Sequence, residues 1–255
     1  MSKKINRFGC LLLAAAVVMG ITAFCGIQKE IGWKAGSDAW KTVKNYAADR
    51  GISAREYPRS LVELLDRNPE TEGFVLNYPF RQEEKIDLRD LDRSSGVPLM
   101  MQWDTRWGYI QYGSDVVGIT GCGPLCLSMA GYYLTGDSKF SPDRVVEFAL
   151  ENGYNVNGSG SSWTLISEGG VKLGLDVTEI PLVKQRILDN LEVGNPIICV
   201  MGPGDFTTTG HFIVLVGEED GLLRINDPNS KANSEKLWKF EDIESQFRNL
   251  WVIRS

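Results

Sequence analysis

The spacing of the apolar residues changes along the second half of the chain, and this change constrains the fold more than any other feature. Up to about residue 193, apolar residues recur three and four positions apart, which predicts helices over 122–134, 141–153, 163–173 and 183–193. Beyond it, short apolar runs typical of strands cover 196–200, 212–217, 222–226 and 250–253. Helices followed by an antiparallel sheet predict an α+β fold.

The composition excludes several kinds of protein. Of the 255 residues, 43% are hydrophobic and 24% are charged, which is ordinary for a globular protein and excludes a disordered or collagen-like chain. The net charge of −6 provides no basic surface for nucleic acid, so we expect no nucleic-acid partner. The one histidine excludes a multi-histidine metal site, and the 5 cysteines are too scattered for a disulfide framework. We therefore expect no metal and no cofactor.

A run of 20 uncharged, mostly apolar residues covers positions 8–27. As a helix it would span about 30 Å, the thickness of a bilayer core. Three basic residues precede it, which predicts that the N-terminus stays inside and that everything after residue 28 is exported. The run exceeds the apolar core of a secretory signal, and bulky Phe24 disfavours lipoprotein processing at Cys25. We predict a signal anchor over 1–27, with a cleaved signal peptide as the alternative.

The next part of the chain has helical signals and then the composition of a linker. Ser37 can cap one helix, and Ser60 can begin a second helix that Asn68-Pro69 ends. Residues 81–95 are densely charged and lead into Gly96. We predict a helical segment over 28–80, a charged linker over 81–95 and the main domain over 96–255. The helical segment is either a spacer that caps the main domain or a pro-segment.

Cys122 begins a predicted helix, within Gly121-Cys122-Gly123-Pro124. The positive end of the helix dipole and the free backbone N–H groups favour the thiolate, which is the nucleophilic form of cysteine. The flanking glycines let a substrate backbone approach closely, and the N–H at the helix start can serve an oxyanion hole. The alternative is a buried structural cysteine.

His211 lies at the start of an apolar strand, a position suited to a general base. Asp227 follows the next strand, 16 positions later. A hairpin of the two strands would place Asp227 beside His211, where the carboxylate can orient the ring. Asp227-Pro228-Asn229-Ser230 is also an ordinary turn sequence. A cysteine at a helix start, the single histidine and this carboxylate together predict a nucleophilic triad.

Short motifs are spread over residues 97–253: Val97-Pro98, Gln102-Trp103-Asp104 with Trp107, Gly121-Cys122-Gly123-Pro124 with Met129, Gly160-Ser161-Ser162-Trp163, Gly202-Pro203-Gly204-Asp205-Phe206, Gly210-His211-Phe212 and Asn226-Asp227-Pro228-Asn229-Ser230. Together they resemble the papain-like cysteine peptidases of the bacteriocin-processing, double-glycine-leader type, in their stand-alone exported form. The resemblance implies a papain-like α+β fold, in which N-terminal helices pack on an antiparallel sheet.

The resemblance also implies roles for particular residues. Cys122 would be the nucleophile, His211 the general base and then acid, and Asp227 the partner that orients His211. Gln102 would donate to the oxyanion, but it precedes Cys122 by 20 positions instead of the usual few, so Gln111 is a second candidate. The residues expected to contact substrate are Gly121, Gly123, Gly160, Ser161, Trp163 and Gly210, although Trp163 can equally cap a helix.

These residues predict an exported thiol peptidase that hydrolyses peptide bonds of a peptide or protein substrate. The sequence shows no transporter domain, so the leader-peptide substrate of transporter-fused relatives does not simply carry over. Two alternatives stay open: an amidase or acyl transferase that acts on cell-wall peptide with the same triad, and a non-catalytic peptide-binding module. The expected location is the cell membrane, with a single span and the catalytic domain outside, or the medium if the signal is cleaved.

Overall fold

The computed structural model describes residues 37–82, 84, 86–156 and 158–255, and these form two compact units that divide between Glu56 and Tyr57. The described part of the first unit holds α2 (Asp38–Asp49) and a 3-10 turn (Ala54–Glu56). Ser37 caps α2, as predicted, by accepting a hydrogen bond from the backbone N–H of Trp40. The anchor predicted over 1–27 lies outside the described residues. Within them, no helix combines the length and apolar character needed to span a bilayer.

Two short helices begin the second unit, α3 (Arg59–Arg67) and α4 (Glu72–Asn77), with 3-10 turns at Pro69–Thr71 and Tyr78–Phe80. The ring of Phe74 on α4 stacks on Tyr109 with the ring centroids 4.4 Å apart. Gly108 and Gly118 leave room for this ring, because a Cβ at Gly118 would lie 2.5 Å from it. Residues 57–80 are therefore packed into the second unit.

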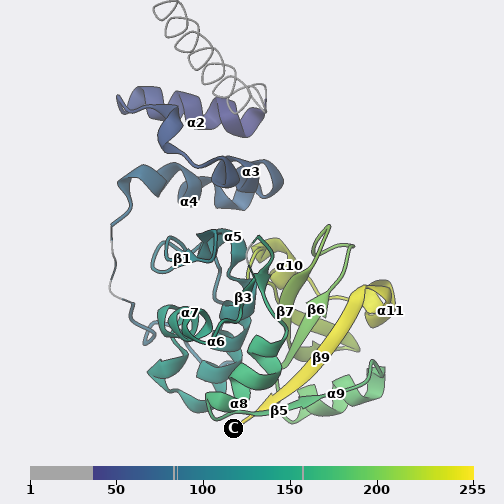
Figure 1. Ribbon diagram of the computed structural model, residues 1–255. Coiled ribbons are helices and arrows are strands. Elements are labelled where there is room, and N and C mark those ends of the chain that lie inside the picture. The colour runs from purple at the N-terminus through teal and green to yellow at the C-terminus, as the bar shows by residue number, and fades with distance from the viewer. Residues whose placement is uncertain (1–36, 83, 85, 157) are drawn as a thin grey trace, which may run out of the picture. The chain divides into compact units, whose positions relative to one another are not determined.

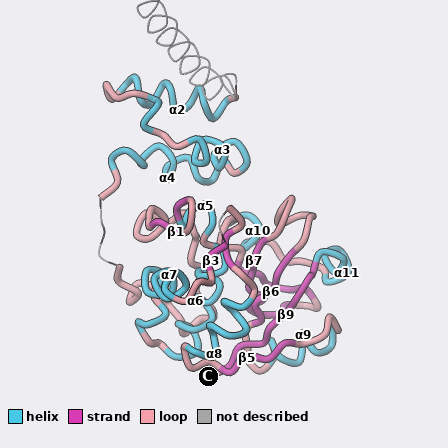
Figure 2. Tube along the Cα trace, viewed as in Figure 1, coloured by secondary structure: helices cyan, strands magenta, loops and turns pink. Residues whose placement is uncertain are grey.

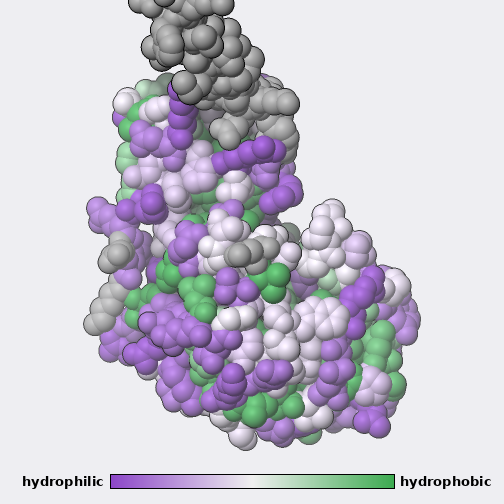
Figure 3. Space-filling model, viewed as in Figure 1, coloured by the Kyte–Doolittle hydropathy of each residue, from purple (hydrophilic) through white to green (hydrophobic). Residues whose placement is uncertain are grey.

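Helices form one layer of the second unit: α5 (Val117–Thr120), α6 (Cys122–Thr135), α7 (Pro142–Glu151) and α8 (Gly170–Lys172). Every residue of α6 from Gly123 to Tyr132 is buried, and Gly136 ends the helix in the left-handed region. The amphipathic α7 lies under a hydrophilic surface (Figure 3), since it exposes Arg144, Glu147 and Glu151. The helix predicted over 163–173 is present, as a π-helical stretch (Leu165–Gly169) that continues into α8.

The other layer is a five-stranded antiparallel sheet with the order β5-β9-β6-β7-β8 (Figure 2). Its strands are β5 (Asp176–Glu179), β6 (Ile197–Met201), β7 (His211–Glu219), β8 (Leu222–Asn226) and β9 (Phe247–Arg254). Two small hairpins accompany it, β1 (Gln111–Tyr112) with β2 (Asp115–Val116), and β3 (Asn155–Val156) with β4 (Gly160–Ser161). The described part of the unit also holds the short helices α9 (Lys184–Glu192), α10 (Lys231–Glu235) and α11 (Phe240–Ile243), with 3-10 turns at Ser138–Phe140 and Glu244–Gln246.

Apolar residues cover both faces of the sheet. One face packs against the buried helix α6, through residues such as Val200, Phe212 and Trp251. The other face packs against α9 and α11, which contribute Ile187 and Ile243 (Figure 1). The predicted α+β architecture, with helices packed on an antiparallel sheet, is confirmed. This packing places the first residues of β7 beside the first residue of α6.

Candidate active site

Cys122 is the first residue of α6 and is partly exposed. Its thiol lies beside the His211 ring and the backbone N–H groups of Phe212 and Gly123, which stabilise the thiolate. Burial acts to raise the pKa of Cys122, but the hydrogen bond and charge of His211, together with the two N–H groups, outweigh it and hold the pKa below its ordinary value. The site therefore favours the nucleophilic thiolate.

His211 begins β7, and Asp227 directly follows β8. Because these strands pair as a hairpin, with Val214 opposite Asn226, both residues lie at the same end of the sheet. His211 Nε2 lies 2.7 Å from Asp227 Oδ1, and the two side chains are 8% and 1% exposed. Since Nε2 faces Asp227, Nδ1 is the ring nitrogen left for Cys122. The structure thus brings the three predicted triad residues together.

The charges of these three groups reinforce one another. Burial acts to lower the pKa of His211, but the charge and hydrogen bond of Asp227, followed by those of Cys122, raise it to about 10. Burial acts to raise the pKa of Asp227, but His211 and two further hydrogen-bond donors hold it below its ordinary value. These shifts all favour an imidazolium between a thiolate and a carboxylate.

Further donors fix the carboxylate of Asp227. Oδ1 also accepts from the backbone N–H of Asn229 at 2.8 Å, and Oδ2 accepts from Nδ2 of Asn233 at 2.8 Å. Asn226, the neighbouring amide, turns away and donates to the carbonyl of Val97 at 2.9 Å. Sequence reasoning missed Asn233, although Ser230 three positions earlier is a helix-cap signal that could have placed it on a helix beside Asp227.

The two glutamines proposed for the oxyanion hole lie in different surroundings. Gln102 is 3% exposed, its Nε2 donates to the carbonyl of Gly118 at 2.9 Å, and its backbone N–H donates to the carbonyl of Pro228 at 2.7 Å. It therefore links the segment that precedes Cys122 to the turn that follows Asp227. Gln111 is exposed on a hairpin and donates to the carbonyl of Gly113 at 3.0 Å. Of the two, Gln102 is the one tied to the segment that leads into Cys122, and the oxyanion role of either glutamine stays a prediction.

Strand β4 lies against the start of α6. A Cβ at Gly123 would lie 2.7 Å from Ser161 Oγ, and Gly160, with φ +81°, lies close to the carbonyl of Thr120. The hydroxyl groups of Ser161 and Tyr112 hydrogen-bond at 2.7 Å. Three of the six residues expected to contact substrate therefore form one wall beside Cys122.

The other three have different surroundings. Trp163 is 46% exposed, and its ring meets Trp251 edge-on with the centroids 6.2 Å apart. A Cβ at Gly121 would lie 2.6 Å from Val117. A Cβ at Gly210 would have nothing within 4 Å, so packing does not require a glycine there. That all six residues contact substrate stays a prediction.

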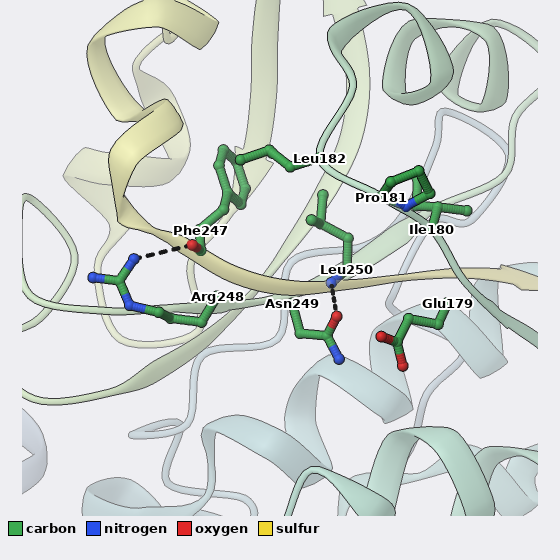
Figure 4. A pocket seen from close by; sticks show the side chains of 8 residues that line it. All are labelled: Glu179, Ile180, Pro181, Leu182, Phe247, Arg248, Asn249 and Leu250. Atoms are coloured by element: carbon green, nitrogen blue, oxygen red, sulfur yellow. Dashed lines mark hydrogen bonds between the residues drawn. The ribbon is translucent and has the colours of Figure 1, made fainter.

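A cavity of about 450 Å³ opens beside the beginning of β9 (Figure 4). It lies at the same end of the sheet as His211. This placement follows from the strand register, because Met201 is paired both with His211 and with Phe247. The cavity is lined by the beginning of β9, the last residue of β5 and the segment that follows it: Glu179, Ile180, Pro181, Leu182, Phe247, Arg248, Asn249 and Leu250. No triad residue lines it, so it is separate from the reacting groups.

The family model described as the Peptidase C39 like family matches residues 94–255. The chain belongs to the Peptidase C39-like family. Residues 94–255 are therefore a C39-like cysteine peptidase domain with the papain-like α+β fold. The predicted resemblance is confirmed.

Three solved structures are similar to this member of the family. The peptidase domain of Streptococcus ComA, a bifunctional ABC transporter involved in quorum sensing, is 22% identical over 61% of this chain and 96% of its own, with a TM-score of 0.42. A putative C39-like peptidase from Bacillus anthracis is 15% identical over 62% and 94%, with a TM-score of 0.42. The ComA peptidase domain of Streptococcus mutans, in complex with a small-molecule inhibitor, is 20% identical over 62% and 98%, with a TM-score of 0.39. No curated protein matches the chain.

Proposed function

We propose that this chain is a thiol-dependent peptidase that hydrolyses peptide bonds through Cys122, His211 and Asp227. The observation that carries the proposal is that the Cys122 thiol lies beside the His211 ring, whose Nε2 lies 2.7 Å from the buried Asp227 carboxylate. A nucleophile, a base within hydrogen-bond reach and a group that orients the base are the parts that covalent acyl transfer requires.

The reaction follows from these positions. The Cys122 thiolate attacks the peptide carbonyl carbon, and the carbonyl oxygen becomes an oxyanion. The backbone N–H of Cys122 has no acceptor within α6, because it lies in the first turn, and it is free to donate to the oxyanion. Gln102 Nε2 carries two hydrogens, and only its bond to Gly118 is short, so it is the second donor.

Proton transfer completes the cycle. His211 gives its proton to the leaving amine, which departs, and a thioester joins the acyl part of the substrate to Cys122. His211 then accepts a proton from water, whose oxygen attacks the thioester and releases the acid. Throughout, Asp227 holds Nε2 and balances the charge of the imidazolium.

We further propose that this domain works outside the cell, tethered by residues 1–27, or in the medium after cleavage of that segment. The support is the uncharged run of 20 residues behind a basic N-terminus. Protease shaving of intact protoplasts tests the proposal: a tethered outer domain is removed, a secreted one is found in the medium with a new N-terminus near residue 28, and a protected inner domain contradicts both.

A screen of the purified full-length chain against a diverse library of internally quenched peptides tests the activity. The wild-type chain cleaves a subset of peptides, and Cys122→Ala cleaves none. Cys126→Ala, one turn further along α6, is the matched control, because Cys126 is fully buried and burial raises its pKa well above the ordinary value. Cleavage by Cys122→Ala contradicts the proposal.

Binding assays and assays on peptidoglycan fragments separate the alternatives from peptide hydrolysis. A peptide-binding module retains peptides without cleaving them. A cell-wall amidase or acyl transferase releases peptide from peptidoglycan fragments, or joins the acyl group to an added amine, and both activities depend on Cys122.

A further inference from the structure

Residues between α3 and α4 contact the turn that follows Asp227. Asn68 Nδ2 donates to the carbonyl of Asn229 at 2.5 Å. The carboxylate of Glu70 accepts from the Ser230 hydroxyl at 3.1 Å and from the backbone N–H groups of Lys231 and Ala232 at 2.7 and 3.3 Å. These contacts join residues about 160 positions apart, so the helical segment and the catalytic turn are held directly together.

The contacts continue to the triad without a gap. Ser230 Oγ, which donates to Glu70, accepts from the backbone N–H of Asn233 at 3.2 Å. Asn233 Nδ2 donates to Asp227 Oδ2 at 2.8 Å, and Asp227 Oδ1 bonds to His211 Nε2 at 2.7 Å. One series of hydrogen bonds therefore runs from Glu70 to the general base.

Helix α10 depends on groups from outside itself. It has 5 residues, and the first backbone N–H groups of any helix have no acceptor within that helix. Glu70 and Ser230 supply acceptors for the N–H groups of Lys231, Ala232 and Asn233. Removal of Glu70 would leave two of these three N–H groups without their acceptor and would free the turn that carries Asn233.

The position of Glu70 is itself fixed by the core. The neighbouring Thr71 is fully buried, and its hydroxyl donates to the carbonyl of Asn68 at 2.7 Å. On α4, Phe74 packs against Gly118, and the Tyr109 hydroxyl donates to the carbonyl of Phe74 at 2.8 Å. Glu70 is therefore held on a packed element, which gives α10 a firm support.

We propose that Glu70 is a positioning residue for the reaction: it fixes the first turn of α10, so that Asn233 holds Asp227 in the orientation that His211 requires. It follows that residues 57–80 belong to the working enzyme and are not a pro-segment to be removed. The inference rests on the triad function proposed above.

The test uses the full-length chain and the variants Glu70→Ala and Glu70→Gln. Glu72→Ala is the matched control, because Glu72 is exposed on α4 and makes none of the contacts described above. Turnover is measured on a peptide that the library screen identifies. A lost helix cap corresponds to about a fivefold change in an equilibrium, so kcat of Glu70→Ala falls about five- to tenfold with KM unchanged. Glu70→Gln keeps one acceptor oxygen, so its kcat should lie between those of Glu70→Ala and the wild type.

A second readout separates positioning from stability. The alkylation rate of Cys122 by iodoacetamide is followed across pH by mass spectrometry of the peptide that contains Cys122. Its upper transition reports deprotonation of His211, whose pKa Asp227 and Cys122 together raise to about 10. A misplaced Asp227 stabilises the protonated His211 ring less, so the pKa of His211 falls and the upper transition moves to lower pH in Glu70→Ala. Partial unfolding lowers the active fraction but leaves the transition where it is in the wild type.

Each outcome bears on a separate claim. A Glu70→Ala variant with wild-type kcat and a wild-type upper transition overturns the inference, while loss of activity in Cys122→Ala still supports the triad. Cleavage by Cys122→Ala overturns the proposed function instead. If Glu70→Ala does not fold, Glu70→Gln decides: a wild-type kcat and transition there overturn the inference, and a partial shift supports it.

Discussion

Replacement of Asp227 by asparagine removes a charge from the buried site while it keeps the shape of the side chain. The asparagine oxygen can accept from His211 and Asn229, as Oδ1 of Asp227 does. The new amide nitrogen then faces Asn233, whose own amide can turn to present its oxygen. The variant therefore isolates the negative charge that lies 2.7 Å from the imidazole.

The size of the effect follows from that distance. An opposite charge this close shifts a pKa by about 1–3 units, and each unit corresponds to about 1.4 kcal/mol. Loss of the Asp227 charge should therefore lower the pKa of His211 from about 10 by roughly that amount and destabilise the thiolate–imidazolium pair by about 1.4–4 kcal/mol. We expect kcat/KM near neutral pH to fall about 10- to 1000-fold, and its alkaline limb to move down by about 1–3 pH units.

The assay is the pH profile of kcat/KM over the range in which both proteins stay folded. Asp220→Asn, at the exposed turn of the same hairpin, is the matched control and should leave the profile unchanged. An alkaline limb that stays in place in a folded Asp227→Asn variant would refute the reasoning, because it would show that the carboxylate charge does not hold the proton on His211.

Three further predictions concern the nucleophile, the oxyanion donor and the helical segment. Cys122→Ala and His211→Ala each abolish turnover, and the double variant is little worse than either, because the groups act as a unit; additive losses in single-turnover assays would contradict this. Gln102→Ala lowers kcat about 100- to 1000-fold, whereas Gln111→Ala leaves it unchanged; the reverse order would assign the oxyanion to the hairpin. Phe74→Ala destabilises the second unit by about 3–5 kcal/mol, which lowers Tm by about 6–20 °C in calorimetry, and a loss under about 1 kcal/mol would show that α4 is not part of the core.

The elements that local signals define could be predicted from the sequence. Helix α6 begins at Cys122 and ends before Gly136, because a glycine at each end sets its limits. The β7–β8 hairpin follows from two apolar runs and a short polar turn, and its register alone brings His211 and Asp227 to the same end of the sheet. The contact between these two residues was therefore accessible from spacing, whereas their catalytic roles stay predictions.

Elements defined by distant contacts could not be predicted. Strand β5 is mostly exposed at the edge of the sheet, so its residues form no apolar run, and only pairing with β9 makes it a strand. The beginning of β9 was missed because Arg248 and Asn249 interrupt the apolar pattern. The contact between Glu70 and the turn at Ser230 crosses most of the chain, and no periodicity in the sequence indicates it.

The activation of Cys122 by His211 is the central claim, and the pH dependence of Cys122 alkylation tests it most directly. In the wild-type chain the lower transition should lie below the ordinary thiol pKa of about 8.5, because His211 and two backbone N–H groups stabilise the thiolate. In His211→Ala the lower transition should move up to about 8.5 or higher, because burial raises the pKa of Cys122 and His211 no longer lowers it. A wild-type transition at or above the ordinary value, or one that is the same in His211→Ala, would contradict the account.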